Sequence, residues 1–349
     1  MKDTVDTKTS SQLCAYCTGT IEDSSKDHIF PQFLGGKRKI ICCKTCNSFF
    51  GHTFEANAAK VLQQVHVFIS SWGIPLRSVN PVWKEAYTKD GETYNFHIGE
   101  RGTVLESSKP VIELHEDGRL KSGKFPDKKR AEKVVRNLID KGKASEDIRI
   151  EEIPSKKVFM PDLGIALHIG PEIRRLALKM CIALSTLLYN FDVAEVSEAR
   201  LYLRGDPRSV PVNNVFAAFN SYEAIDSQRE ALSHVIYVER NQTGVYGLVQ
   251  FFGAIQLFCR VGILPNKSQG AALFATLDPI AGEEKLSESS LLNLTPPPYF
   301  YSIEEASKLA EGWIMKLGDE AKKRGSNPTD LRMSRVEFHN KISVDENRK

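Results

Sequence analysis

The sequence predicts an α+β protein in which a small zinc-stabilised module precedes a larger region of mixed helices and strands. Five of the seven cysteines fall within the first 46 residues, which indicates a metal-stapled segment too small to build a stable core alone. Farther along, helical and strand patterns occur without the regular alternation of a parallel sheet. A chain of 349 residues is also long enough for a module and a second domain.

Domain boundaries are predicted where the sequence pattern changes. Apolar residues recur at helical spacing from Phe54 to about Ser70, and Gly73 and Pro75 then end the pattern. We therefore expect a module over residues 12–72, an α+β domain over residues 76–325 and a loosely ordered tail over residues 326–349.

The larger region carries both kinds of periodicity. Alternating apolar residues between turn signals predict strands at 92–98, 110–115, 147–160, 234–238 and 245–261, the last bending at Gly253. Helical spacing predicts helices at 127–143, 171–190 and 303–316, with Asp127 and Ser302 as N-caps. Within helix 171–190, Lys179 is interpreted as part of a polar edge together with Arg174 and Arg175. Cys181 and Cys259 are interpreted as buried core residues.

Bulk properties narrow the class of protein. The formal net charge of +3 is too weak to indicate nucleic acid by itself, so that argument has to be local. The longest apolar stretch is interrupted by charges, which predicts no membrane partner, and the polar start predicts no signal peptide. We expect a cytoplasmic protein, in which clustered cysteines are metal ligands rather than disulfides.

Two cysteine pairs predict one metal site. Cys14 and Cys17 form a Cys-x2-Cys turn, and Cys43 and Cys46 form a second after 25 intervening residues. Two such turns complete a closed tetrahedral zinc site, so this zinc is expected to be structural. Cys42 would point the other way in an extended segment and is interpreted as a packing residue, although a shift of register would make it a ligand.

The segment between the pairs carries residues with chemistry. It reads Asp27-His28-Ile-Phe-Pro31, then Leu34-Gly-Gly-Lys37, and the second pair continues as Cys46-Asn47 and Phe50-Gly51. This pattern resembles the HNH endonucleases of the ββα-metal type, in the branch with a four-cysteine zinc site. The resemblance covers roughly residues 12–60 and implies a treble-clef-like fold and hydrolysis of phosphodiester bonds.

The chemistry needs these residue types. Histidine can activate water near neutral pH, and Asp and Asn oxygens suit a hard cation such as Mg²⁺ or Mn²⁺. The resemblance implies that His28 is the general base and that Asp27 and Asn47 hold a catalytic divalent metal. Neighbouring strand residues point to opposite faces, so the family also implies that Asp27 or His28 lies at a bend.

One further metal ligand is expected on the following helix. Other HNH branches place a histidine there, and the candidates here are His52 and Glu55. Glu55 lies about 80° from Asn47 around an α-helix and His52 about 140°, which favours Glu55. The alternative for both is an ordinary helix surface residue.

Basic residues near the motif predict contacts to nucleic-acid phosphates. The candidates are Lys26, Lys37, Arg38, Lys39 and Lys44. A second basic stretch over residues 119–143 holds ten Lys or Arg against three Asp or Glu, and it would serve either as a DNA contact or as a solvated face.

The expected function is therefore a metal-dependent DNA endonuclease acting on double-stranded DNA. Two alternatives stay open: a non-catalytic zinc module that only binds nucleic acid, and a nuclease that acts on RNA. The larger region would choose the target, supply a homodimer surface or respond to a signal. By analogy with related proteins of this size, we expect a role in restriction or anti-phage defence, with a partner protein from such a system.

Overall fold

The structure is a computed structural model of the chain. It describes residues 13–76, 82–89, 92–99, 102–107, 111–125, 128–145, 147–148, 150, 166–188, 197–206, 215–217, 222–262, 270–295, 303–326 and 335–337. Among these residues, no helix is both long enough and apolar enough to span a membrane. The predicted strand 147–160 and the predicted N-caps Asp127 and Ser302 lie outside the described residues, apart from the first few positions of that strand.

The chain divides into two compact units. The first unit combines residues 1–62, 72–79 and 164–349, and the second combines residues 63–71 and 80–163. The N-terminal module therefore shares a unit with the C-terminal half of the chain, across a long separation in sequence. The domain boundaries expected from the sequence, near residues 72–76 and 325–326, differ from the limits of these two units and stay a prediction.

The N-terminal module is a β-hairpin followed by a helix, as predicted. Strand β1 (Ser24–His28) pairs antiparallel with β2 (Lys39–Cys43), and η1 (Gln32–Leu34) lies in the connection between them. Helix α1 (Lys44–Phe50) runs through a π-helical turn, η2 (Gly51–Glu55), into α2 (Ala56–Ser71). Three buried aromatic rings, Tyr16, Phe50 and Phe54, form the small core that these elements share.

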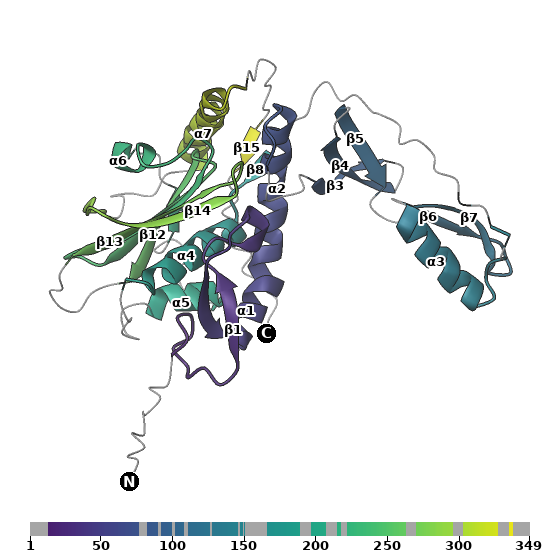
Figure 1. Cartoon of the computed structure of the whole chain (residues 1–349), viewed down its shortest axis with the longest axis horizontal. Coiled ribbons are helices and arrows are strands. Elements are labelled where there is room, and N and C mark those ends of the chain that lie inside the picture. The colour runs from purple at the N-terminus through teal and green to yellow at the C-terminus, as the bar shows by residue number, and fades with distance from the viewer. Residues whose placement is uncertain are drawn as a thin grey trace, which may run out of the picture. The chain divides into compact units, whose positions relative to one another are not determined.

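A six-stranded antiparallel sheet forms the centre of the first unit (Figure 1). Its order is β14 (Glu283–Ser289), β13 (Ala271–Asp278), β10 (His234–Arg240), β11 (Val245–Phe251), β12 (Ile255–Gly262) and β9 (Val215–Ala217). The prediction of one strand over 245–261 that bends at Gly253 was wrong. Phe252 and Gly253 both have positive φ, 55° and 64°, so the chain reverses there into a hairpin.

Helix α4 (Pro171–Ser185) packs on one face of this sheet and also contacts η2 of the N-terminal module. Every residue from Leu176 to Ser185 is buried, because the helix has a neighbour on both sides. The approach to the sheet is close: a Cβ added to Gly247 of β11 would lie 2.4 Å from the Cys181 Sγ. Helix α5 (Ser197–Leu203) packs beside α4.

The other face of the sheet is buried as well. Short helix α6 (Glu223–Asp226) and the segment after β14 supply Ile225 and Leu294 to a cluster with Tyr237, Leu248 and Phe274. Burial on both faces explains why β10 and β11 are buried along almost their whole length instead of alternating. Cys181 and Cys259 are fully buried, as predicted.

The C-terminal elements complete the first unit. Helix α7 (Ile303–Lys323) extends seven residues past the predicted end, and its Glu320 receives a hydrogen bond from the Leu232 backbone and an ion pair from Arg229. Strand β15 (Arg335–Glu337) pairs parallel with β8 (Ala166–His168), inside the segment expected to be a loosely ordered tail.

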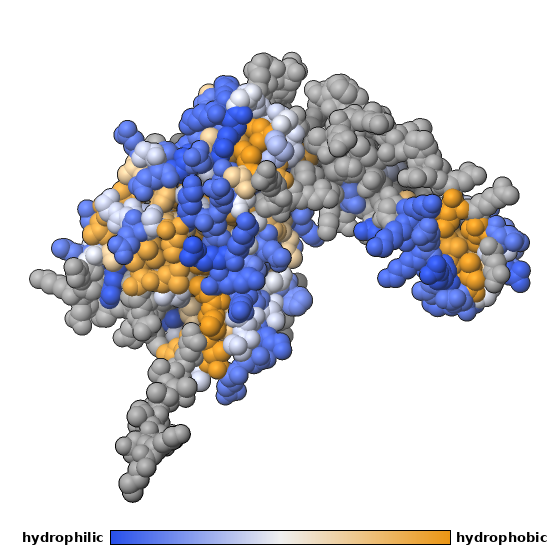
Figure 2. Space-filling view, in the orientation of Figure 1, coloured by the Kyte–Doolittle hydropathy of each residue, from blue (hydrophilic) through white to orange (hydrophobic). Residues whose placement is uncertain are grey.

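Among the described residues, the second unit contains antiparallel strands, helix α3 and the last part of α2. Strands β3 (Val82–Lys89), β4 (Glu92–Gly99) and β5 (Gly102–Ser107) form one sheet, β6 (Val111–Leu114) and β7 (Leu120–Lys124) form a hairpin, and α3 (Lys128–Asp140) follows. The helix buries Ala131 and Val135 and exposes its basic residues, so Figure 2 shows a hydrophilic surface over α3.

Candidate functional site: a four-cysteine cluster beside a carboxylate pocket

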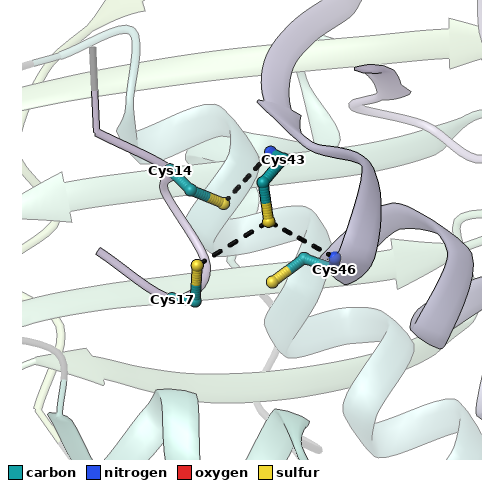
Figure 3. Close-up of side chains that lie close together, drawn as sticks. All are labelled: Cys14, Cys17, Cys43 and Cys46. Carbon is teal, nitrogen blue, oxygen red and sulfur yellow. Dashed lines mark hydrogen bonds between the residues drawn. The ribbon is translucent and has the colours of Figure 1, made fainter. Parts of the chain in front are cut away.

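The four predicted zinc ligands come together at one point. The sulfur atoms of Cys14, Cys17, Cys43 and Cys46 all lie within 4.8 Å of one another, and those of Cys17 and Cys43 are 3.7 Å apart (Figure 3). A tetrahedral zinc with bonds of about 2.3 Å to sulfur separates its ligands by about 3.8 Å, so the cluster has the dimensions of a zinc site. The backbone N–H of Cys43 donates to the Cys14 sulfur, and that of Cys46 to the Cys43 sulfur, as expected for groups that hold zinc ligands in place.

The electrostatics of the four cysteines are also consistent with a bound cation. A hydrogen bond from the Cys46 thiol lowers the pKa of Cys14 to about 4. The same hydrogen bond raises the pKa of Cys46, and burial raises that of Cys17. Four thiolates at this spacing would repel one another, and a metal ion would supply the positive charge that offsets this repulsion.

The spare cysteine has the packing role predicted for it. Cys42 is fully buried and lies outside the four-cysteine cluster. A neighbour that the sequence did not predict is Arg200 of α5, whose guanidinium donates to the Ala15 carbonyl inside the first cysteine turn at 3.1 and 3.2 Å. The C-terminal half of the chain therefore contacts the first Cys-x2-Cys turn directly.

One pocket brings the predicted catalytic residues together. Its lining includes Asp27 and His28 from the end of β1, Asn47 from α1 and Glu55 from the end of η2. The strand ends at His28, and Ile29 and Phe30 form a bend directly after it. The expectation that Asp27 or His28 lies at a bend was wrong, because both residues lie in β1 and pair with Ile40 and Lys39.

Asp27 is the most enclosed of these residues, with 4% of its surface exposed. The Tyr16 hydroxyl donates to its Oδ2 at 2.6 Å, and the Lys179 ammonium donates to its Oδ1 at 2.6 Å. Tyr16 stands between the first two zinc ligands, so folding of the zinc knuckle and placement of the Asp27 carboxylate are linked. The aromatic residue inside the Cys-x2-Cys turn is the signal by which Tyr16 could have been found.

The predicted place of Lys179, on a polar edge of α4, was wrong. The residue is 1% exposed. Its ammonium is 2.7 Å from the Glu55 Oε1 and donates to the His28 carbonyl at 3.3 Å, besides its bond to Asp27. Burial alone would lower the pKa of Lys179, but the Asp27 and Glu55 carboxylates outweigh it and raise the pKa, so the ammonium stays charged. A single lysine between Leu178 and Met180, within a long apolar run, was the available signal.

The electrostatics of His28 suit a base. Partial burial lowers the pKa of His28, and Lys39 and Lys179 lower it further, which outweighs the opposing effect of Asp27 and Glu284. A histidine with a lowered pKa is neutral near pH 7 and can accept a proton. Its side chain is half-buried at the pocket wall.

Asn47 and Glu55 face the same pocket, whereas His52 is exposed and is not among the lining residues. The amide nitrogen of Asn47 donates to the Ser25 hydroxyl at 2.7 Å, so it ties α1 to β1 through the atom that a metal would not use. The wide π-helical turn contributes to the place of Glu55, because it departs from the α-helical spacing assumed in the prediction.

The donor set of the pocket fits a hard divalent cation. Asp27, Glu55 and the Asn47 carbonyl supply oxygen atoms, which Mg²⁺ and Mn²⁺ prefer. The Glu55 Oε1 is buried and receives no aligned hydrogen bond from any described residue, although the Lys179 ammonium lies within ion-pair distance. A buried carboxylate oxygen of this kind is a suitable metal ligand.

The five predicted phosphate contacts have different surroundings. Lys37 and Arg38 are held by the start of β14 and the turn before it: both backbone N–H groups donate to Glu284 Oε2 of β14, and the Lys37 ammonium donates to the Gly282 carbonyl in the turn. Lys44 pairs with exposed Asp23 at 3.1 Å. The other two, Lys26 and Lys39, are exposed.

The glycine pair before these lysines has a structural reason. Gly35 has a φ of 98°, and a Cβ on Gly36 would lie 1.7 Å from the Phe30 carbonyl oxygen. Glycine is therefore required by the chain's own packing at this turn, and access for a phosphate is not needed to explain it.

Comparison with known families agrees with this geometry. Residues 14–63 match the family model described as HNH endonuclease. The match contains all four zinc ligands together with Asp27, His28, Asn47 and Glu55, and the predicted resemblance is confirmed for this segment. Neither the curated proteins nor the solved structures returned a match.

Proposed function

We propose that the protein is a metal-dependent endonuclease that hydrolyses phosphodiester bonds in double-stranded DNA. The observation that carries the proposal is the pocket: within a segment that matches the HNH endonuclease model, one cavity is lined by a histidine, two carboxylates and an asparagine. A pure binding module has no need of that combination. Nuclease activity is also what the family description suggests.

In the proposed reaction, His28 removes a proton from the attacking water. Its lowered pKa keeps it neutral and therefore able to accept that proton near pH 7. Asp27, Asn47 and Glu55 would hold the divalent cation, which when bound stabilises negative charge on the phosphate. Tyr16 keeps the Asp27 carboxylate in one orientation through its hydrogen bond.

The zinc cluster has a separate, structural role in this proposal. Its four cysteine ligands leave no open coordination position for substrate. It fixes the end of the first cysteine turn, which carries Tyr16, against the strand that carries Asp27 and His28. A role in restriction or anti-phage defence, a homodimer and a partner protein stay predictions, as does the cytoplasmic location.

The test is plasmid nicking in Mg²⁺ or Mn²⁺ with the wild type and the His28→Ala variant. We expect the variant to lose at least about 100-fold in cleavage rate, because a general base contributes that much or more. His115→Ala, which removes an exposed histidine of the second unit, is the matched control and should cleave like the wild type. Zinc content and circular dichroism should be the same for all three proteins.

Cleavage by His28→Ala at the wild-type rate would remove His28 from the mechanism. Nucleic-acid binding by the wild type without any cleavage would favour the non-catalytic zinc module. Single-turnover rates on duplex DNA, single strands, branched DNA and RNA would decide between a DNA and an RNA substrate.

A further inference from the structure

The pocket already contains a cation, and it comes from outside the family-matched segment. The Lys179 ammonium lies 2.6 Å from the Asp27 Oδ1 and 2.7 Å from the Glu55 Oε1. Its side chain is 1% exposed, and that of Asp27 is 5% exposed. The ammonium is therefore enclosed with the two carboxylates and is not one of many exchangeable surface partners.

A divalent ion shared by the same two carboxylates would need the same space. Mg²⁺ binds carboxylate oxygens at about 2.0–2.1 Å, so an ion that contacts both Asp27 Oδ1 and Glu55 Oε1 would fall where the ammonium nitrogen now lies. The two cations would also repel each other strongly at such a distance. The ammonium and a bridging divalent ion are thus alternatives.

The position of Lys179 is set by the C-terminal half of the chain. Two residues on, Cys181 projects from the opposite side of α4 and packs against Gly247 of the central sheet. Helix α4 therefore contacts the sheet on one side and presents Lys179 to the N-terminal module on the other. Movement of α4 relative to the module would change the distance between the ammonium and the carboxylates.

The same half of the chain also supplies an anion to the module. Glu284, whose side chain is 6% exposed, accepts hydrogen bonds from the backbone N–H groups of Lys37 and Arg38 at 2.8 and 2.9 Å. Paired backbone N–H groups are a common phosphate-binding arrangement. The C-terminal half therefore contacts the module at two places. Lys179 binds the predicted metal ligands Asp27 and Glu55, and Glu284 binds the backbone of the predicted phosphate contacts Lys37 and Arg38.

We infer that Lys179 is an intramolecular competitor for the catalytic divalent ion, through which the C-terminal half of the chain controls metal binding. The inference rests on the proposed function, because it concerns the metal site of the nuclease. With Lys179 between Asp27 and Glu55 the site is latent, and these carboxylates would hold a divalent ion only after the ammonium leaves them. The flexible four-carbon stem of lysine allows that exchange without unfolding of α4.

The test measures Mn²⁺ binding to the full zinc-loaded chain by electron paramagnetic resonance of free Mn²⁺. Lys179→Met keeps the apolar stem and removes the charge. We expect it to bind Mn²⁺ at least about ten-fold more tightly than the wild type, because buried Asp27 and half-buried Glu55 are left without the ammonium. We also expect Mn²⁺ to raise the thermal midpoint of the variant far more than that of the wild type.

Two controls separate competition from a general charge effect. Lys60→Met removes an exposed positive charge from helix α2 of the same module, outside the pocket lining and the predicted phosphate contacts, and should leave Mn²⁺ affinity within about two-fold of the wild type. Adding Glu55→Gln to Lys179→Met removes one of the two carboxylates and should cancel the gain.

Equal or weaker Mn²⁺ binding by Lys179→Met would overturn the inference. A Lys179→Met chain that folds only when Mn²⁺ is present would support it, whereas one that stays unfolded in excess Mn²⁺ would overturn it, because the ion could then not replace the ammonium. Plasmid nicking separates this result from the proposed function. If Lys179→Met binds Mn²⁺ more tightly but neither protein cleaves DNA, only the proposed nuclease function is contradicted. If cleavage depends on His28 but Lys179→Met leaves Mn²⁺ affinity unchanged, only the competition by Lys179 is contradicted.

Discussion

Asp27 shows how much a single residue depends on partners that are far away in the sequence. Its two oxygens are held by Tyr16, 11 residues before it, and by Lys179, 152 residues after it. A buried carboxylate without such partners would be strongly destabilising. The residue type was predictable from the motif, but the partners that allow it to be buried were not.

The Tyr16 hydroxyl provides a test at this scale. Tyr16→Phe removes one hydrogen bond to a buried charged group, so we expect the free energy of unfolding to fall by about 1–3 kcal/mol, while zinc content stays unchanged. Denaturant titration followed by circular dichroism measures the change. Tyr246→Phe is the control: its hydroxyl bonds a neutral carbonyl at 3.3 Å, and the loss should be about 1 kcal/mol or less. No difference between Tyr16→Phe and the wild type would show that this bond contributes nothing.

At the scale of elements, helix α4 was predicted correctly at its start, but it ends at Ser185 instead of Asn190, and its environment was predicted only in part. Its apolar spacing predicted a core helix, and the structure has one from Pro171 to Ser185. The prediction of a polar edge at Lys179 failed because it assumed that one side of the helix faces water. The module packs on that side, and a buried charge there is satisfied by the carboxylates of the module.

The contact between α4 and β11 can be tested by adding a single methyl group. Gly247→Ala would place that methyl 2.4 Å from the Cys181 Sγ, and we expect a loss of about 1–3 kcal/mol in the free energy of unfolding from overpacking. Denaturant titration measures the loss. Adding Cys181→Ala removes that sulfur and should recover part of the loss, although the Cys181 Cβ would still lie at 3.0 Å.

Gly312→Ala is the matched control for this pair. Gly312 lies in helix α7, and no neighbouring atom comes within 4 Å of the place that an alanine methyl would take, so alanine should be neutral or stabilising there. If Gly247→Ala were as stable as the wild type, the close approach of α4 to the sheet would be wrong.

At the scale of the molecule, the N-terminal module and the C-terminal half of the chain depend on each other. The module provides acceptors for Lys179 and Arg200, and the C-terminal half provides the cations that the module's buried groups need. Zinc binding is linked to folding of the module, so loss of zinc should also destabilise the parts of the C-terminal half that contact the module.

This linkage predicts the outcome of zinc removal. In Cys46→Ser, or in the wild type with a strong chelator, we expect helix α4 to lose protection against hydrogen exchange, because Lys179 then lacks its partners. Hydrogen exchange measured by mass spectrometry should show the loss in peptides of residues 171–185. Peptides of α3, residues 128–140 in the second unit, are the internal control and should not change. Unchanged protection of α4 would mean that the two parts are energetically independent.

The four-cysteine cluster, the ββα order of the module and the candidate residues that line its pocket were all predictable from the sequence. They depend on short, regular spacings: Cys-x2-Cys turns, an Asp-His pair at the end of a strand, and Asn47 directly after the last cysteine. A metal ion imposes such spacings through its coordination geometry, so they can be recognised without a fold.

The surroundings of that chemistry became visible only in the folded chain. Three contacts join side chains that no local sequence pattern connects. They are the ion pairs of Lys179 with Asp27 and Glu55, the hydrogen bond from Tyr16 to Asp27, and the hydrogen bonds from the Lys37 and Arg38 backbone to Glu284. They cannot be predicted from local patterns, because a charged side chain is stable in the interior only when the fold places an opposite charge beside it. Here that placement depends on how α4 and the sheet pack against the module.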